Sequence, residues 1–127
     1  MKEAAKETVK QVIDNSVDKA KEKARGEAEI DAAKIVKEAE VKGQALRDEA
    51  AKAAEGIRRE VEIQSQKLME GAASKGTIAK MAAQKTADSM KKTADKKANQ
   101  LIQEADVQAN KLVEEAKVKS ADLVKKI

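Results

Sequence analysis

The side chains of this 127-residue chain that could take part in chemistry are carboxylates, lysines, serines and methionines, because histidine and cysteine are absent. Without those two residue types the chain has no zinc finger, thiol nucleophile, iron–sulfur ligand set or His-based triad. Paired carboxylates such as Glu114 and Glu115 would suit general acid–base catalysis. Adjacent residues on a helix point about 100° apart, however, so this pair shares no site.

Methionine and serine offer two further kinds of site. Met69, Met81 and Met90 could hold a soft metal ion, but core packing is the far commoner use of methionine. Ser65 and Ser120 take the place of small residues in the repeat described below, so we expect each hydroxyl to bond to a backbone carbonyl one turn back. We therefore predict no catalytic residue, no cofactor, no metal site and no small-molecule substrate.

The composition favours long helices. Charged residues make up 39% of the chain and hydrophobic residues, alanine included, 41%, and there is no aromatic residue and no proline. Alanine, lysine and glutamate are strong helix formers, and proline is the commonest helix breaker. The net charge of +4 is a small excess, and without stacking aromatics it does not indicate a nucleic-acid partner.

The sequence gives little information about location in the cell. It contains no apolar run of the length that a transmembrane helix needs, and its first residues, MKEAAKETVKQV, lack the apolar stretch of a secretory signal. We expect a cytoplasmic protein by default, or an envelope-associated one if the chain is a processed or excised segment.

An internal repeat organises most of the chain. From Val17 onward the sequence divides into consecutive hendecad units, each eleven positions long, followed by Ile127, with no insertion or deletion. With Val17 as position 1, position 1 is Ala in eight units, position 5 is small in nine, and position 8 is Ile, Leu or Met in eight. This is the hendecad pattern of about 3.67 residues per turn, which predicts an all-α fold with a straight or gently right-handed coiled coil.

Positions 1, 5 and 8 form a narrow stripe of small and aliphatic side chains along one side of a helix. A lone helix cannot bury its own stripe, so we expect a partner surface: another copy, the other half of the chain, a different helix or a lipid interface. The predicted oligomer seam consists of Ile35, Ala39, Gly43, Leu46, Ala50, Ala54, Ile57, Val61, Ser65, Leu68, Ala72, Gly76, Ala79, Ala83, Ala87, Met90, Ala94, Ala98, Leu101, Ala105, Ala109, Leu112, Ala116, Ser120 and Leu123.

The two edges of the stripe carry opposite charges. Position 11 is Glu in six units, and position 9 is Arg or Lys in five. In parallel helices the acidic edge of one helix meets the basic edge of the next, which favours that orientation. We therefore expect the chain to associate with itself as a parallel homo-oligomer.

Two chain paths are compatible with the repeat. The favoured one is a continuous helix over residues 17–127, preceded by a loosely patterned helical N-terminus at residues 1–16. The alternative is a helical hairpin that reverses within residues 71–77, with Gly71 as a C-cap and Thr77 as an N-cap. The hendecad phase runs unbroken through this segment, and a loop has no need to keep phase, so we expect the continuous helix.

Units such as ADKKANQLIQE and ADVQANKLVEE resemble the hendecad coiled-coil proteins, which are long Ala-rich tails and stalks of bacterial envelope-associated proteins. The units are also similar to those in the peripheral stalks of rotary ATPases. The resemblance covers the chain from Val17 to its end. It implies a non-enzymatic rod, spacer or scaffold that assembles with itself, and it carries over no catalytic residue.

The segment KTADSMKKTADKKANQ resembles a second group, the surfactant helices with hendecad repeats. Synucleins, exchangeable apolipoproteins and late-embryogenesis-abundant proteins belong to this group. The resemblance implies an alternative function as a stress-protective helix that folds on an anionic membrane surface. The chain departs from the pattern in having no aromatic residue and a stripe made mostly of alanine.

Overall fold

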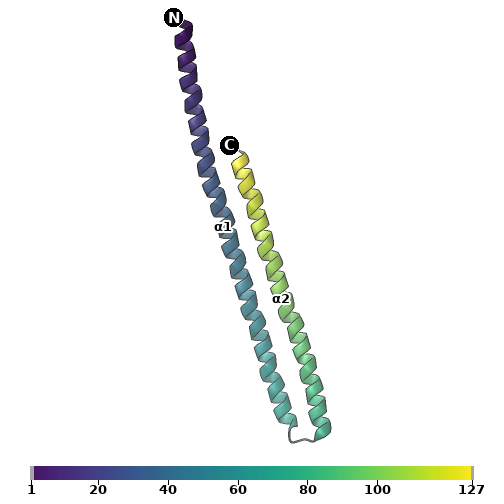
Figure 1. The fold of residues 1–127 in the computed structure, drawn as a ribbon. Coiled ribbons are helices and arrows are strands. Elements are labelled where there is room, and N and C mark those ends of the chain that lie inside the picture. The colour runs from purple at the N-terminus through teal and green to yellow at the C-terminus, as the bar shows by residue number, and fades with distance from the viewer. Residues whose placement is uncertain (1, 127) are drawn as a thin grey trace. The chain divides into compact units, whose positions relative to one another are not determined.

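Two long α-helices account for nearly all of the fold. The structure, a computed structural model, describes the backbone of residues 2–126 and the side chains of residues 8–126. Helix α1 comprises Lys2–Ala72 and helix α2 comprises Thr77–Lys125 (Figure 1). Residues 2–126 contain no strand, so the predicted all-α fold is confirmed. Residue 1, the first of the predicted segment 1–16, and residue 127, the last of the predicted segment 17–127, lie outside the described backbone.

The helix breaks at residues 73–76. Gly76 has a φ of 100°, in the left-handed region that glycine adopts without the steric penalty of a Cβ atom. The Lys75 amide donates a 3.0 Å hydrogen bond to the Ala72 carbonyl, which closes the turn that ends α1. The expected continuous helix over residues 17–127 is therefore wrong at this point, and the alternative reversal within residues 71–77 is present.

The residues at the two helix ends differ from those we expected. Gly71 is still helical, and α1 continues to Ala72. Gly76 occupies the N-cap of α2, because its carbonyl accepts the first helical hydrogen bond, from the Lys80 amide at 3.1 Å. Thr77 is the first residue of α2 rather than its cap.

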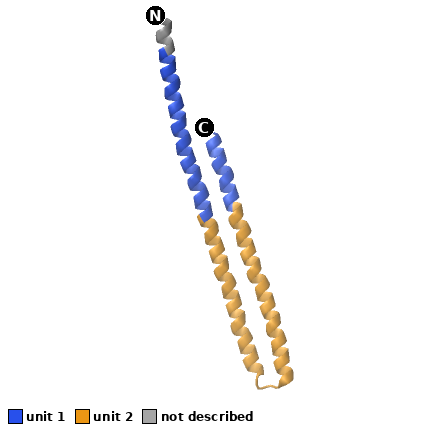
Figure 2. Ribbon diagram, in the orientation of Figure 1, with its two compact units in different colours: residues 1–40, 112–127 blue, residues 41–111 orange. Residues whose placement is uncertain are grey.

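The chain divides into two compact units (Figure 2). Unit 2 comprises residues 41–111, in which the C-terminal part of α1, the turn and most of α2 form an antiparallel helical hairpin. Unit 1 comprises residues 1–40 and 112–127, so the N-terminal part of α1 lies with the C-terminal part of α2. Its buried side chains are Ala28, Ala32, Ala39 and Ala116.

Within unit 1 the two helical segments have different lengths. Burial on α1 starts close to Ala28, whereas every residue from 9 to 25 is exposed. Helix α2 ends at Lys125, so the described part of α1 continues past the end of its neighbour (Figure 2). Neither helix, over the described residues, is long and apolar enough to cross a membrane.

Candidate functional site

The surface that the chain is built to form is the contact between α1 and α2, and the predicted seam residues lie along it. All but two of them are buried or half-buried. The exceptions are Gly76, which is in the turn, and Leu123. The buried ones are Ala39, Gly43, Ala54, Ser65, Ala72, Ala83, Ala87, Ala94, Ala98, Ala105, Ala109 and Ala116. The half-buried ones are Ile35, Leu46, Ala50, Ile57, Val61, Leu68, Ala79, Met90, Leu101, Leu112 and Ser120.

Small residues at position 5 of the hendecad bring the two helices of unit 2 together. A Cβ atom built on Gly43 would stand 3.1 Å from the Ala109 Cβ atom, which is tighter than about nine in ten real Cβ contacts. Because the helices run antiparallel, the same register places Ala54 opposite Ala98. The exposed fractions of these two side chains are 1% and 0%. Position 5 is therefore the line of closest approach, and a larger residue there would separate the helices.

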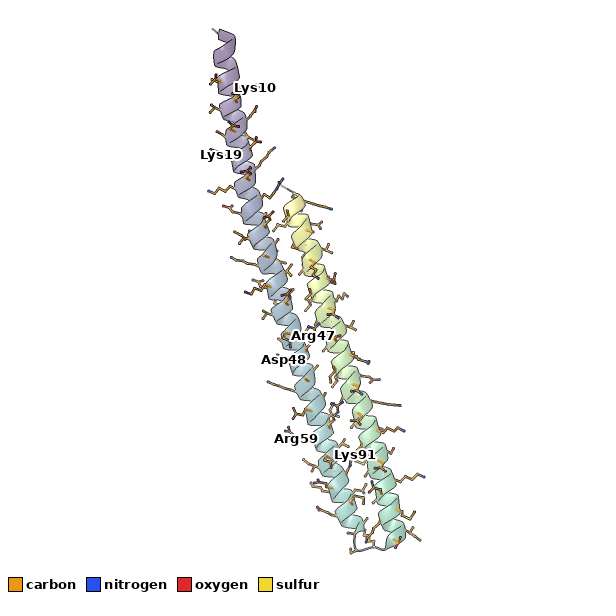
Figure 3. The ribbon with its side chains drawn as sticks, in the orientation of Figure 1. Lys10, Lys19, Arg47, Asp48, Arg59 and Lys91 are labelled. Atoms are coloured by element: carbon orange, nitrogen blue, oxygen red, sulfur yellow. The ribbon has the colours of Figure 1, made fainter. Side chains whose placement is uncertain are left out.

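One edge of the contact is held by an arginine that bridges two polar residues of α2. Arg47 Nε donates a 2.9 Å hydrogen bond to Asp106 Oδ1, and Arg47 Nη2 donates a 2.6 Å hydrogen bond to Asn110 Oδ1. Asp106 and Asn110 are one helical turn apart, so the two arms of the guanidinium match their spacing. Arg47 extends into the space between the helices, whereas Arg59 lies on the outer side of α1 (Figure 3).

The same clamp occurs again one hendecad along the hairpin. Arg58 Nε donates to Asp95 Oδ1 at 3.2 Å, and Arg58 Nη2 donates to Asn99 Oδ1 at 2.9 Å. From Arg47 to Arg58 the contact advances one hendecad on α1, and from Asp106 to Asp95 it returns one hendecad on α2. The side chains are partly exposed, so each pair contributes on the order of 0.2–1 kcal/mol. Their main effect is to fix register and direction.

The basic residues at position 9 do not pair with the glutamates at position 11 in this hairpin. Arg47, Arg58 and Lys91 pair instead with acidic residues at position 2. The Lys91 pair is with Glu62, where Lys91 Nζ lies 3.5 Å from Glu62 Oε2. In an antiparallel pair, equivalent positions of the two helices lie on the same side of the contact. Positions 9 and 2 lie on the same edge of the stripe, and position 11 lies on the other edge. Position 9 of one helix therefore meets position 2 of the other. Sequence reasoning missed this partner because it assumed parallel helices.

The opposite edge of the contact is apolar and shallow. Open grooves run between the helices of unit 2 on this side, and one is lined by Ile57, Val61, Met90 and Thr93. The large side chains at position 8 stay half-buried here because only two helices meet. The ionisable side chains that line these grooves are lysines, Lys67 and Lys75 in one groove and Lys97 in another, and the described residues contain no cluster of three or more His, Cys, Asp or Glu side chains that could hold a metal ion.

The two seam serines behave differently. Ser120 Oγ donates a 2.8 Å hydrogen bond to the Lys117 carbonyl, as expected. Ser65 is only 2% exposed, and its hydroxyl has no hydrogen-bond partner, so the expected bond to a carbonyl one turn back is absent. The close approach at position 5 removes water from Ser65, and the residue that the register places opposite it, Ala87, offers no polar side chain.

Comparison with protein-family models, with curated proteins and with solved structures gave no match for this chain. Any inference about function therefore depends on the helix–helix contact itself.

Proposed function

We propose that this chain is a non-enzymatic structural protein: a rod, spacer or scaffold that assembles with copies of itself through the hendecad stripe. The observation that carries the proposal is the composition of the contact. Among residues 8–126, every buried position is Ala, Ser or Gly, and no large side chain is fully buried. Such a contact joins helices closely over a long distance, and it offers no enclosed cavity in which a substrate could react.

Two features support self-assembly in particular. The large aliphatic residues at position 8 remain half-buried after the chain has folded on itself, as Leu46, Ile57 and Leu101 do. In addition, residues 9–25 of α1 carry exposed apolar side chains, among them Val9, Ile13 and Val17. Exposed apolar area of this kind gains about 25 cal/mol per Å² when another surface covers it, so association with a second copy is favourable.

The proposal is tested by measuring mass and length together. Sedimentation equilibrium from about 10 µM to about 1 mM should show association, because weak helix–helix contacts of small area fall in this range. Small-angle X-ray scattering on the same samples should show an elongated particle whose length rises with mass. A species that stays monomeric over the whole concentration range would overturn the proposal.

A membrane-surface function is the alternative, and one observation favours it. Val9, Val12 and Ile13 are exposed by 56–58%, and lysines such as Lys10 and Lys19 accompany them. A helix of this kind can lie on an anionic lipid surface. Titration with anionic phospholipid vesicles, followed by circular dichroism, separates the two functions. The alternative requires helix content to rise only when vesicles are added, whereas the structural function requires a full helix signal without lipid.

A further inference from the structure

The open edge is the side of the α1–α2 contact in unit 2 that lies opposite the arginine clamps. Two grooves run along it, and both are lined by residues at positions 1, 4, 7, 8 and 11 of the repeat. The other edge is closed by the clamps that Arg47 and Arg58 form with α2. The open edge is therefore the side on which further helices can extend the contact.

Large aliphatic side chains at position 8 form a row along the open edge, and they alternate between the two helices. In the register that the clamps set, Ile57 of α1 lies between Met90 and Leu101 of α2. Leu46 follows Leu101 on the side away from the turn. All four side chains are half-buried. The α1–α2 contact covers one side of this row, so a second row of the same kind can complete its burial.

Lysines and glutamates flank the apolar row. Position 4 holds Lys42 on α1 and Lys97 on α2, whereas position 11 holds Glu49 and Glu60 on α1 and Glu104 on α2. All five side chains are exposed, and none of them forms an ion pair with another described side chain. Their charges are therefore available to a partner that lies on the open edge.

We propose that two copies of this chain pack open edge against open edge as antiparallel hairpins, related by a two-fold axis that passes beside Leu101. This inference depends on the proposed function as a self-assembling protein, and it names the surface and the direction of assembly. In this arrangement α1 lies on α1 of the second copy, and α2 lies on α2. Leu101 faces its own copy, and Leu46 faces Ile57 of the second copy, so the two apolar rows cover each other. The contact uses the same surface of both copies and is closed.

The flanking charges fit a second copy in this register. Lys42 lies level with Glu60 of the second copy, Lys97 lies level with Glu104 of the second copy, and the two-fold axis repeats both pairs. Sliding one copy by a hendecad in one direction adds a like-charged contact, Glu60 with Asp31 of the second copy. Sliding it the other way leaves both lysines without an acidic residue at their level. The lysine stems can lie over the apolar row while their ammonium groups reach the glutamates.

The same side chains disfavour parallel hairpins. A two-fold axis parallel to the helices would place α1 on α2 of the second copy. The clamp register then brings Glu49 level with Glu104 of the second copy, and symmetry repeats this like-charged contact. Because like charges that face each other across an interface oppose association, the antiparallel arrangement is the favoured one.

Exchange of charges tests the pairing of Lys42 with Glu60. Lys42→Glu should raise the dissociation constant of the dimer about 10-fold at low ionic strength, because two attractive pairs become repulsive, and Glu60→Lys should do the same. The variant with both substitutions should regain the original dissociation constant, since each pair forms again with its signs exchanged. Lys52→Glu is the matched control, because Lys52 is exposed at position 3, on the side of α1 opposite the stripe. Sedimentation equilibrium measures all four variants.

Cysteine cross-linking tests the position of the axis, because the chain contains no cysteine of its own. Leu101→Cys alone should give a disulfide-linked dimer under mild oxidation, since this residue faces its own copy. Leu46→Cys mixed with Ile57→Cys should give a heterodimer. Each of these two variants alone should give little dimer, because the residue and its own copy lie one hendecad apart, about 16 Å along the helices. Circular dichroism checks that every variant keeps its helices.

The outcomes separate this inference from the function on which it rests. Association that is unchanged in Lys42→Glu and gives no Leu101→Cys dimer means that another surface assembles, which overturns the inference and leaves the proposed function standing. Association that becomes at least about 10-fold tighter in Glu49→Lys indicates parallel hairpins and also overturns the inference. A chain that is monomeric at every concentration overturns both.

Discussion

Gly43 of α1 lies against Ala109 of α2, so close that a Cβ atom on Gly43 would stand 3.1 Å from the Ala109 Cβ atom and 3.3 Å from the Ala109 carbonyl oxygen. The pair marks the line of closest approach in the hairpin of unit 2. Because Arg47 reaches Asp106 only one helical turn farther along α1, the tight contact and the polar clamp specify the same register.

Substitutions of Gly43 should change the free energy of unfolding according to the size of the new side chain, because Ala109 leaves little space beside Gly43. Gly43→Ala gains helix propensity but forces the helices apart by a few tenths of an ångström, so we expect almost no net change in the free energy of unfolding. Gly43→Leu should lower it by about 1–3 kcal/mol. Gly56→Ala is the control, because nothing lies within 4 Å of its Cβ position, and it should raise stability by about 0.5–1 kcal/mol. Urea unfolding followed by circular dichroism measures all three, and a stable Gly43→Leu variant would contradict the close contact.

The clamp formed by Arg58 should contribute a small, salt-dependent coupling energy. A double-mutant cycle of Arg58→Ala and Asp95→Ala should give about 0.5 kcal/mol at low ionic strength and less in about 1 M salt. Arg58→Lys should lose most of this coupling, because an ammonium group cannot bond to Asp95 and Asn99 with two fixed arms. A coupling energy indistinguishable from zero at low salt would mean that the clamp is not formed in solution.

The stability of the turn between α1 and α2 should depend on Gly76, the glycine at its end. Gly76 has a φ of 100°, so Gly76→Ala should lower the free energy of unfolding by about 1–2 kcal/mol. Gly71→Ala provides the comparison within the same segment. Gly71 is helical and has open space around its Cβ position, so this change should raise stability by about 0.5–1 kcal/mol. If Gly76→Ala proved as stabilising as Gly71→Ala, residue 76 would be helical and the turn would be absent.

Removing the unpaired hydroxyl of Ser65 should stabilise the hairpin. A buried hydroxyl without a hydrogen bond costs on the order of 1–3 kcal/mol, so Ser65→Ala should raise the free energy of unfolding by about 1 kcal/mol. Ser120→Ala is the control, because its hydroxyl bonds to the Lys117 carbonyl and its loss should leave stability nearly unchanged. Thermal unfolding of the two variants distinguishes them. Loss of stability in Ser65→Ala would show that its hydroxyl finds a partner in solution.

Much of the contact could be predicted from the hendecad spacing. Ala54, Ala87 and Ala98 were placed on the stripe by their positions in the repeat, and each is almost completely buried. Their burial follows from the period of the helix, which is a local property of the backbone. The same reasoning did not show that residues 9–25 are all exposed, because this segment lacks the strict repeat and burial depends on whether another helix lies beside it.

The turn could not be predicted from the repeat. The hendecad phase passes through residues 73–76 without interruption, but phase records the spacing of residue types and not the course of the backbone. The residue that signalled the turn was Gly76, but glycine is also small enough to fit position 5 of the repeat. Because a glycine satisfies both a small seam position and a left-handed turn, the sequence left the two paths nearly equal.

By itself, the sequence determined that this chain is helical and that each helix carries a narrow stripe of small residues, because both depend on spacing within a few turns. Only the tertiary structure decided which surface covers the stripe and which residues of α2 the two arginines contact. Arg47 and Arg58 each bond to the Asp at position 2 of the repeat and to the Asn one turn beyond it, and residues 9–25 remain exposed. These depend on the direction of the partner helix. Once the chain turns at Gly76, α2 is tethered to α1 at a high effective concentration and covers the nearest stripe.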